Sequence, residues 1–183
     1  MRIVFPFLII IGLGVQLSVS SCQFNQNVKC SDNKEVDIDS LTCFYENWLI
    51  HNQKGKIHIS LSDEENVEEL FMEYLGVIKT GEDSILLIKN DALFGLPQSP
   101  HRNGSITIYQ NEKKIGRYIG FNYMFKAWVE NNELIIRFHL GNSDNESIIG
   151  PLNVISFDGG VPKDFIVKDS NTAFGEYIYL ETE

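Results

Sequence analysis

Four histidines are the side chains of this sequence best suited to acid–base chemistry or metal binding: His51, His58, His101 and His139. Their separations do not match the short spacings typical of zinc ligands. The chain also lacks the Gly-x-Ser-x-Gly, His-Glu-x-x-His and Cys-x-x-Cys motifs and a glycine-rich phosphate-binding loop. The sequence therefore predicts no metal site and no cofactor, and it favours a protein without catalytic activity.

One catalytic alternative stays open. Asp158 precedes Gly159-Gly160 and could present a carboxylate at a site that a ligand can approach closely. His139 or His101 could supply the base of a hydrolase if the fold brings either of them to Asp158. Their order in the sequence does not decide whether they meet in space.

The stronger candidate is a β-hairpin over residues 121–140. Its turn is Asn131-Asn132, because asparagine tolerates the positive φ that both positions of a two-residue turn require. This turn fixes the register, so Glu130 faces Glu133. The pairs that follow on one face are all apolar: Val129 with Leu134, Ala127 with Ile136, Phe125 with Phe138 and Tyr123 with Leu140. We expect that face to be part of the core.

The opposite face of the same hairpin is mixed. The register pairs Trp128 with Ile135, Lys126 with Arg137, and Met124 with His139. Two cations directly opposite each other destabilise a strand pair by a few tenths to about 1 kcal/mol. Acidic side chains from a neighbouring loop could neutralise them. Alternatively, a recognition patch for an anionic or aromatic group is formed by Lys126, Trp128, Arg137 and His139.

The start of the chain has the features of an export signal. Arg2 is followed by an apolar run over residues 3–15, which is too short to span a membrane. The run leads to Val19-Ser20-Ser21-Cys22, which resembles the lipobox of bacterial lipoproteins. The resemblance covers the signal region alone and implies that residues 1–21 are removed and that Cys22 is acylated. Gln23, in place of aspartate, implies sorting to the outer membrane, facing the periplasm or the cell surface. Ordinary secretory cleavage before Cys22 is the alternative.

The chain has three cysteines, Cys22, Cys30 and Cys43, and an odd number in an exported protein leaves one thiol unexplained. Acylation of Cys22 would leave Cys30 and Cys43, an even pair that we expect to form a disulfide in an oxidising compartment. The alternative for Cys43 is a buried free thiol on a helix.

The chain is acidic, with 15 basic and 25 acidic side chains and a formal net charge of −10. This charge argues against a nucleic-acid partner and suits a basic protein partner. It also means that attachment to a membrane would come from acyl chains rather than from basic side chains. Residues 22–39 are rich in Asn, Gln, Ser, Lys and Asp, which predicts a flexible tether.

A single globular domain is expected over residues 40–183. Apolar spacing predicts a helix over residues 41–51 with Leu41, Phe44, Tyr45, Trp48 and Leu49 on its inner face, or alternatively a strand over residues 44–50. A strand is predicted over residues 57–61. The capping box that starts at Ser62 predicts a second helix, which would end at Gly76. A strand over residues 85–88 and a long loop over residues 91–104 follow.

The rest of the chain predicts strands on both sides of the hairpin, over residues 105–110, 115–119, 153–157, 165–168 and 177–180. Many strands late in the chain and few helices early in it indicate an α+β fold, with one or two N-terminal helices packed on a mainly antiparallel sheet. Together with the lipobox, this favours a non-catalytic envelope lipoprotein that binds another macromolecule, one version being an immunity- or inhibitor-type protein. The alternatives are an envelope hydrolase and a passive structural adaptor.

Overall fold

Two antiparallel β-sheets and one helix form the part of the chain that the structure, a computed structural model, describes: residues 38–62, 64–122, 124–138, 150–168 and 175–182. The helix α1 is Ile38–Asn52. The first five strands are β1 (Lys56–Ser60), β2 (Val67–Thr80), β3 (Asp83–Leu96), β4 (Ser99–Gln110) and β5 (Lys113–Phe121). The others are β6 (Phe125–Glu130), β7 (Glu133–Phe138), β8 (Asn153–Ile155), β9 (Asp164–Val167) and β10 (Glu176–Glu181).

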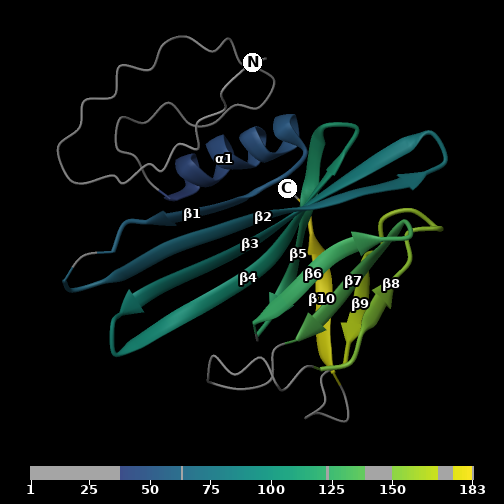
Figure 1. The fold of residues 1–183 in the computed structure, drawn as a ribbon. Coiled ribbons are helices and arrows are strands. Elements are labelled where there is room, and N and C mark those ends of the chain that lie inside the picture. Colours follow the sequence, from purple (N-terminus) through teal and green to yellow (C-terminus); the bar gives the residue numbers. More distant parts are fainter. Residues whose placement is uncertain (1–37, 63, 123, 139–149, 169–174, 183) are drawn as a thin grey trace, which may run out of the picture.

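The larger sheet has seven strands in the order β1-β2-β3-β4-β5-β10-β9, and the smaller has the order β6-β7-β8. The small sheet packs on one face of the large sheet, and α1 lies along the other face (Figure 1). Leu87, Ile106 and Phe138 belong to the core between the sheets, whereas Leu49 and Ile88 belong to the core under the helix. The prediction of a mainly antiparallel single domain is confirmed, with one helix in the described residues.

Tyr118 is a polar side chain in the core between the sheets. Its ring is fully buried, and its hydroxyl donates a hydrogen bond of 2.8 Å to the carbonyl oxygen of Pro162. Burial raises the pKa of Tyr118 well above its usual range, because the phenolate would lose its hydration. The hydroxyl therefore stays protonated and serves as a fixed donor to the segment before β9.

The predicted helix at the start of the domain is confirmed, but its inner face is rotated from the predicted one. Leu49 is fully buried, whereas Phe44 and Trp48 are 51% and 37% exposed. The buried stripe instead includes the acidic residue Glu46, which is 3% exposed. A charged residue on a buried helix face is unusual, so the apolar spacing alone gave the wrong rotation.

The second predicted helix is wrong. This segment is β2, which pairs with β1 on one side and β3 on the other. Apolar residues lie on both faces of this strand, and together they imitate the spacing of a helix face. The side chain of Ser62 caps no helix; its Oγ accepts a 3.0 Å hydrogen bond from the backbone nitrogen of Glu68.

The predicted loop over residues 91–104 is also wrong. Strand β3 continues to Leu96 and β4 begins at Ser99, so the two form one long hairpin in which Asp91 pairs with Gly104 and Gly95 with Pro100. The turn lies at Pro97, as the proline signal suggests, but the strands continue almost to it. The residues between Asp91 and Gly104 therefore occupy fixed positions on two sheet faces.

The hairpin around Asn131-Asn132 has the predicted register. Glu130 pairs with Glu133 and Phe125 with Phe138, and both asparagines have positive φ values, 51° and 67°. The amide side chain of Asn132 also exchanges hydrogen bonds of 2.6 and 2.7 Å with the backbone of Lys79, which joins the turn to the end of β2. The later strands predicted from the sequence correspond to β4, β5, β8, β9 and β10.

Candidate functional site

The outer face of the small sheet carries the residues of the predicted recognition patch. Lys126 on β6 pairs directly with Arg137 on β7, and Trp128 pairs with Ile135, as the register predicts. His139 lies outside the described residues, so its place beside Met124 stays a prediction. The structure therefore brings together three of the four predicted residues.

The two cations have no acidic partner among the described residues. Lys126 is exposed, and the side-chain Nε of Arg137 is buried without a hydrogen-bond partner in that part of the chain. The indole nitrogen of Trp128 donates a 3.1 Å hydrogen bond to Glu130 Oε2, at the end of the same strand. The Glu130 carboxylate thus binds Trp128, and no described ion pair compensates the two cations.

Exposed apolar side chains surround this pair. Met124, just before β6, is 47% exposed. Leu152, just before β8, and Val154 on β8 are each 52% exposed. Val154 pairs with Ile135, so it lies on the same face as the cations. An apolar surround reduces the hydration of a charged group at an interface and strengthens its interaction with an opposite charge. We call Met124, Lys126, Trp128, Arg137 and Val154 the small-sheet patch.

A second candidate site is a groove on the large sheet, on the face that also carries the small sheet. Its cavity volume is about 370 Å³. Six charged or ionisable side chains line it: Lys56, His58, Glu73, Lys89, Asp91 and Arg102. Its apolar lining is Ile57, Phe71 and Met72. The groove lies across β1 to β4, and each of these strands contributes at least one of the six.

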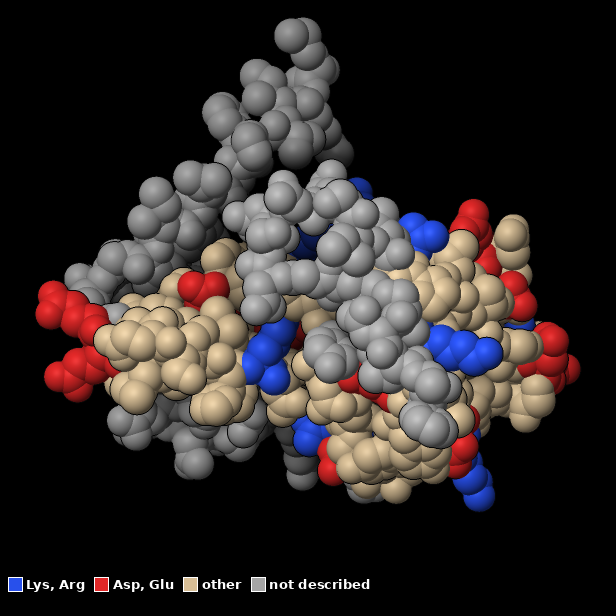
Figure 2. Space-filling view, turned by 90° about the horizontal axis from the view of Figure 1, so that it is seen from below, with Lys and Arg blue, Asp and Glu red and all other residues tan. Residues whose placement is uncertain are grey.

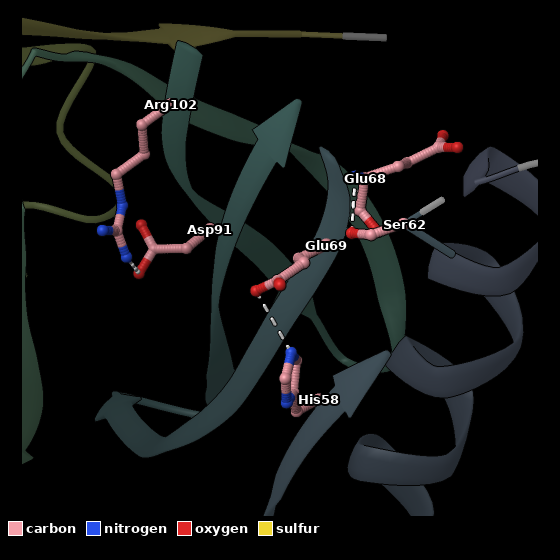
Figure 3. Close-up of polar contacts among 6 residues, drawn as sticks. All are labelled: His58, Ser62, Glu68, Glu69, Asp91 and Arg102. Carbon is pink, nitrogen blue, oxygen red and sulfur yellow. Dashed lines mark hydrogen bonds and ion pairs between the residues drawn. The ribbon is translucent and has the colours of Figure 1, made fainter. Parts of the chain in front are cut away.

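The centre of the groove is a buried carboxylate between two cations. Asp91 Oδ2 lies 2.6 Å from Lys89 Nζ. It also lies 3.3 Å from Arg102 Nη2, the contact that Figure 3 shows. The Lys89 ammonium also lies 4.7 Å from the ring centroid of Phe125, a cation–π contact with the small sheet. The other oxygen, Asp91 Oδ1, is buried with no hydrogen-bond partner in the described part of the chain.

The outer wall of the groove is more exposed. His58 Nε2 lies 3.3 Å from Glu69 Oε2, and the His58 ring stacks on Phe71 at a centroid distance of 4.2 Å. Figure 3 shows Ser62 nearby, with its hydroxyl hydrogen-bonded to the main chain of Glu68 and not to His58. This cluster therefore does not form a nucleophile–base pair.

A third polar cluster holds α1 to the large sheet. Glu46 Oε1 accepts hydrogen bonds from Asn90 Nδ2 at 2.8 Å and Thr107 Oγ at 2.7 Å, and Oε2 accepts one from Tyr109 at 2.7 Å. All four residues are buried. Because this carboxylate is buried and both of its oxygens accept hydrogen bonds from the sheet, we assign it a structural role.

The residues of the hydrolase alternative do not meet in the described structure. Asp158 follows β8 and is exposed, and His101 lies near the tip of the β3–β4 hairpin, where its ring contacts Phe94. No hydrogen bond or ion pair joins these two side chains. His139 lies outside the described residues. Within the described ranges, no group of three or more His, Cys, Asp and Glu side chains could hold a metal ion.

The predicted lipidation site Cys22 and the disulfide candidate Cys30 also lie outside the described residues, so both predictions stay open. Cys43 lies in α1, half-buried, and its sulfur accepts a hydrogen bond from Asn47 Nδ2 at 3.8 Å. No helix in the described ranges is long and apolar enough to cross a membrane.

Lys89, Asp91 and Arg102 were not predicted as site residues, because the sequence pattern places two of them in or at the edge of a loop. The signal was present: Lys89 and Asp91 follow the apolar run of β3 two residues apart, which is the spacing of one strand face. In the hairpin of β3 and β4, Arg102 on β4 pairs with Leu93 on β3. Leu93 is two residues from Asp91 and on the same strand face, so Arg102 lies close to Asp91.

The fold and the two surface sites define a small two-sheet antiparallel β domain with one helix and two candidate binding surfaces. A scan against protein-family models finds no match, and no curated protein or solved structure matches the chain. Figure 2 shows acidic side chains at both ends of one face of the molecule, with basic side chains between them.

Proposed function

We propose that the protein is a non-catalytic, lipid-anchored envelope protein that binds another macromolecule through the small-sheet patch. The single observation that carries this proposal is the cross-strand pair of Lys126 and Arg137, with no described carboxylate beside it. The lipid attachment at Cys22 and the outer-membrane location rest on the lipobox resemblance. An immunity- or inhibitor-type protein is one concrete form of such a binder.

The energetics of the pair favour a partner. Like charges directly opposite each other on a strand pair cost a few tenths to about 1 kcal/mol, and a buried donor without an acceptor, such as Arg137 Nε, costs about 1–3 kcal/mol. A carboxylate from a partner, placed between Lys126 and Arg137, would remove the repulsion between the two cations. Trp128 and the exposed apolar side chains would bury the contact, and tryptophan and arginine are common energetic centres of protein interfaces.

The overall charge supports a particular kind of protein partner. A formal net charge of −10 attracts a basic protein over long distances, whereas the local cation pair attracts an acidic group at short range. We therefore propose a basic protein that presents a carboxylate at the contact. A passive adaptor would need neither the apolar surround nor the cation pair, so we favour a binding protein.

Replacing Lys126 with glutamate tests the patch. The new carboxylate would pair with Arg137 across the strands, so the free energy of unfolding should rise by a few tenths to about 1 kcal/mol. Binding of the partner should weaken more than about tenfold, because two carboxylates would then face each other. Urea denaturation gives the first quantity, and recovery of a stoichiometric partner from envelope extract gives the second.

Lys113→Glu is the matched control, because Lys113 is an exposed lysine at the start of β5, outside the patch. It makes the same change in net charge and should leave partner recovery unaffected. A lower stability of Lys126→Glu would mean that Lys126 is already paired within the protein, and the patch would then be ordinary structure.

Replacing Cys22 with alanine tests the lipid anchor. The variant should lose its acyl chains and keep its signal segment, because the acylated cysteine is the expected attachment and processing site. Labelling with a fatty-acid analogue and the mass of the protein measure these two effects. Cys30→Ala should behave as wild type in this assay, and a membrane-bound, labelled Cys22→Ala protein would disprove the anchor.

A further inference from the structure

We propose that the groove around Asp91 and Arg102 is a second binding site, which takes a small organic carboxylate with an apolar body and a hydroxyl or amino donor next to the carboxylate. The site is separate from the small-sheet patch and does not depend on the proposed function. Its cavity of about 370 Å³ is at the lower end of the size range of small-molecule sites, which is roughly 300–1,000 Å³.

The buried ion pair of Lys89 and Asp91 at the centre of the groove supports this proposal. The side chains of Lys89 and Asp91 are only 13% and 6% exposed. Burying two charges costs desolvation energy, and a hydrophobic pair of similar volume is often equally stable or more stable. Stability therefore explains the ion pair poorly, whereas recognition of a polar ligand in the adjoining groove explains it directly.

Arg102 and Asp91 also have unused hydrogen-bonding groups, which supports a polar ligand in the groove. A guanidinium has five N–H donors, and Arg102 uses one of them, at 3.3 Å, on an Asp91 oxygen that Lys89 already contacts at 2.6 Å. Arg102 lines the groove and its side chain is 32% exposed, so its other donors are available to an incoming carboxylate (Figure 3). The unpartnered Asp91 Oδ1 offers an acceptor close by, which suits a ligand that also carries a donor.

The surroundings of Asp91 are shaped to hold this arrangement. A Cβ at position 104 would lie 3.1 Å from Asp91 Oδ1 and 2.9 Å from Phe125 Cε1, so glycine leaves the space that these two side chains use. On the other side of the groove, Phe71 with His58 stacked on it provides an apolar wall. The apolar body of the ligand would pack against this wall while the ligand carboxylate binds the Arg102 guanidinium.

The probe is 3-phenyllactate, which has a carboxylate, an adjacent hydroxyl and an apolar ring. Its methyl ester has the same body without the charge. In amide NMR spectra of the purified full chain, phenyllactate should cause saturable shifts around Asp91, Arg102 and Phe71, and the ester should cause none. Arg102→Gln should weaken phenyllactate binding at least about tenfold, because it removes a charge-assisted contact.

Arg117→Gln is the matched control, because Arg117 is an exposed arginine on β5 that pairs with Glu181 away from the groove. It should bind phenyllactate as wild type does. Lys126→Glu should also bind normally, so this proposal and the proposed function can fail separately. Three results would overturn the groove proposal: no saturable shifts in the wild-type protein, equal binding of the ester, or unchanged binding by a folded Arg102→Gln variant.

Discussion

Replacing Glu46 with alanine should lower the free energy of unfolding by about 3–5 kcal/mol, one of the two largest effects we expect for a single substitution. The substitution removes a link between α1 and the large sheet that is made of buried polar groups. Most of the loss in stability comes from the buried donors of Asn90, Thr107 and Tyr109, which the substitution leaves without the Glu46 acceptor. Urea denaturation, followed by far-ultraviolet circular dichroism, measures the change.

The geometry of the cluster explains the size of the effect. One carboxylate oxygen accepts from Asn90 and Thr107, and the other accepts from the Tyr109 hydroxyl, all at 2.7–2.8 Å. Glu46 itself is 3% exposed, so water does not replace it without opening the interface between helix and sheet. Asn90 and Thr107 would keep their mutual hydrogen bond of 2.8 Å, which limits the loss.

Glu46→Gln separates the charge from the hydrogen bonds. Glutamine keeps the shape and one acceptor oxygen, and its amide can donate to the Tyr109 hydroxyl, so we expect a loss of only about 1–2 kcal/mol. Glu82→Ala, at an exposed turn position, should change stability by less than about 0.5 kcal/mol. If Glu46→Ala is as mild as Glu82→Ala, the network does not hold α1 to the sheet.

The hairpin of β6 and β7 could be predicted from sequence because the residues that determine its turn and register are close together in the chain. Asn131 and Asn132 fix the turn, the turn fixes the register, and the alternation of side chains then assigns each residue to a face. Lys126 and Arg137 followed from that register without any knowledge of the rest of the fold. The same local logic gave the later strands.

The second helix and the loop over residues 91–104 failed because tertiary pairing overrides local signals. The spacing of Leu70, Phe71 and Tyr74 fits a helix, but β2 is held between two antiparallel neighbours and is apolar on both faces. Gly95 and Pro100 indicate a loop, yet they pair with each other near the hairpin tip. No local rule distinguishes these cases before the neighbouring strands are known.

The buried charged residues of the groove and of the cluster under α1 were not predicted for a related reason. Asp91 and Glu46 are charged residues that a sequence pattern assigns to the surface, and both are buried against partners on other strands. Glu46 meets Tyr109, and Asp91 meets Arg102 from the opposite strand of a long hairpin. Such partners become visible only when the strand register is known.

Replacing Gly76 with alanine should lower the free energy of unfolding by about 2–5 kcal/mol, through two separate costs. Gly76 lies at the bulge where the register between β2 and β3 shifts, with a φ of +139° that residues with a side chain rarely adopt. The strain from this φ is about 1–2 kcal/mol. An added Cβ would also lie 2.8 Å from the Cβ of Val129 on β6, and overpacking of this kind costs about 1–3 kcal/mol.

Gly81→Ala isolates the backbone cost. Gly81, at the turn between β2 and β3, also has a positive φ, +61°, but nothing lies within 4 Å of its added Cβ. This variant should therefore lose only about 1–2 kcal/mol in the same urea denaturation experiment. A larger loss for Gly76→Ala than for Gly81→Ala would come from the contact between the two sheets at Val129. Equal losses would mean that the small sheet shifts away from β2 at little cost, so the close packing at Gly76 would not fix its position.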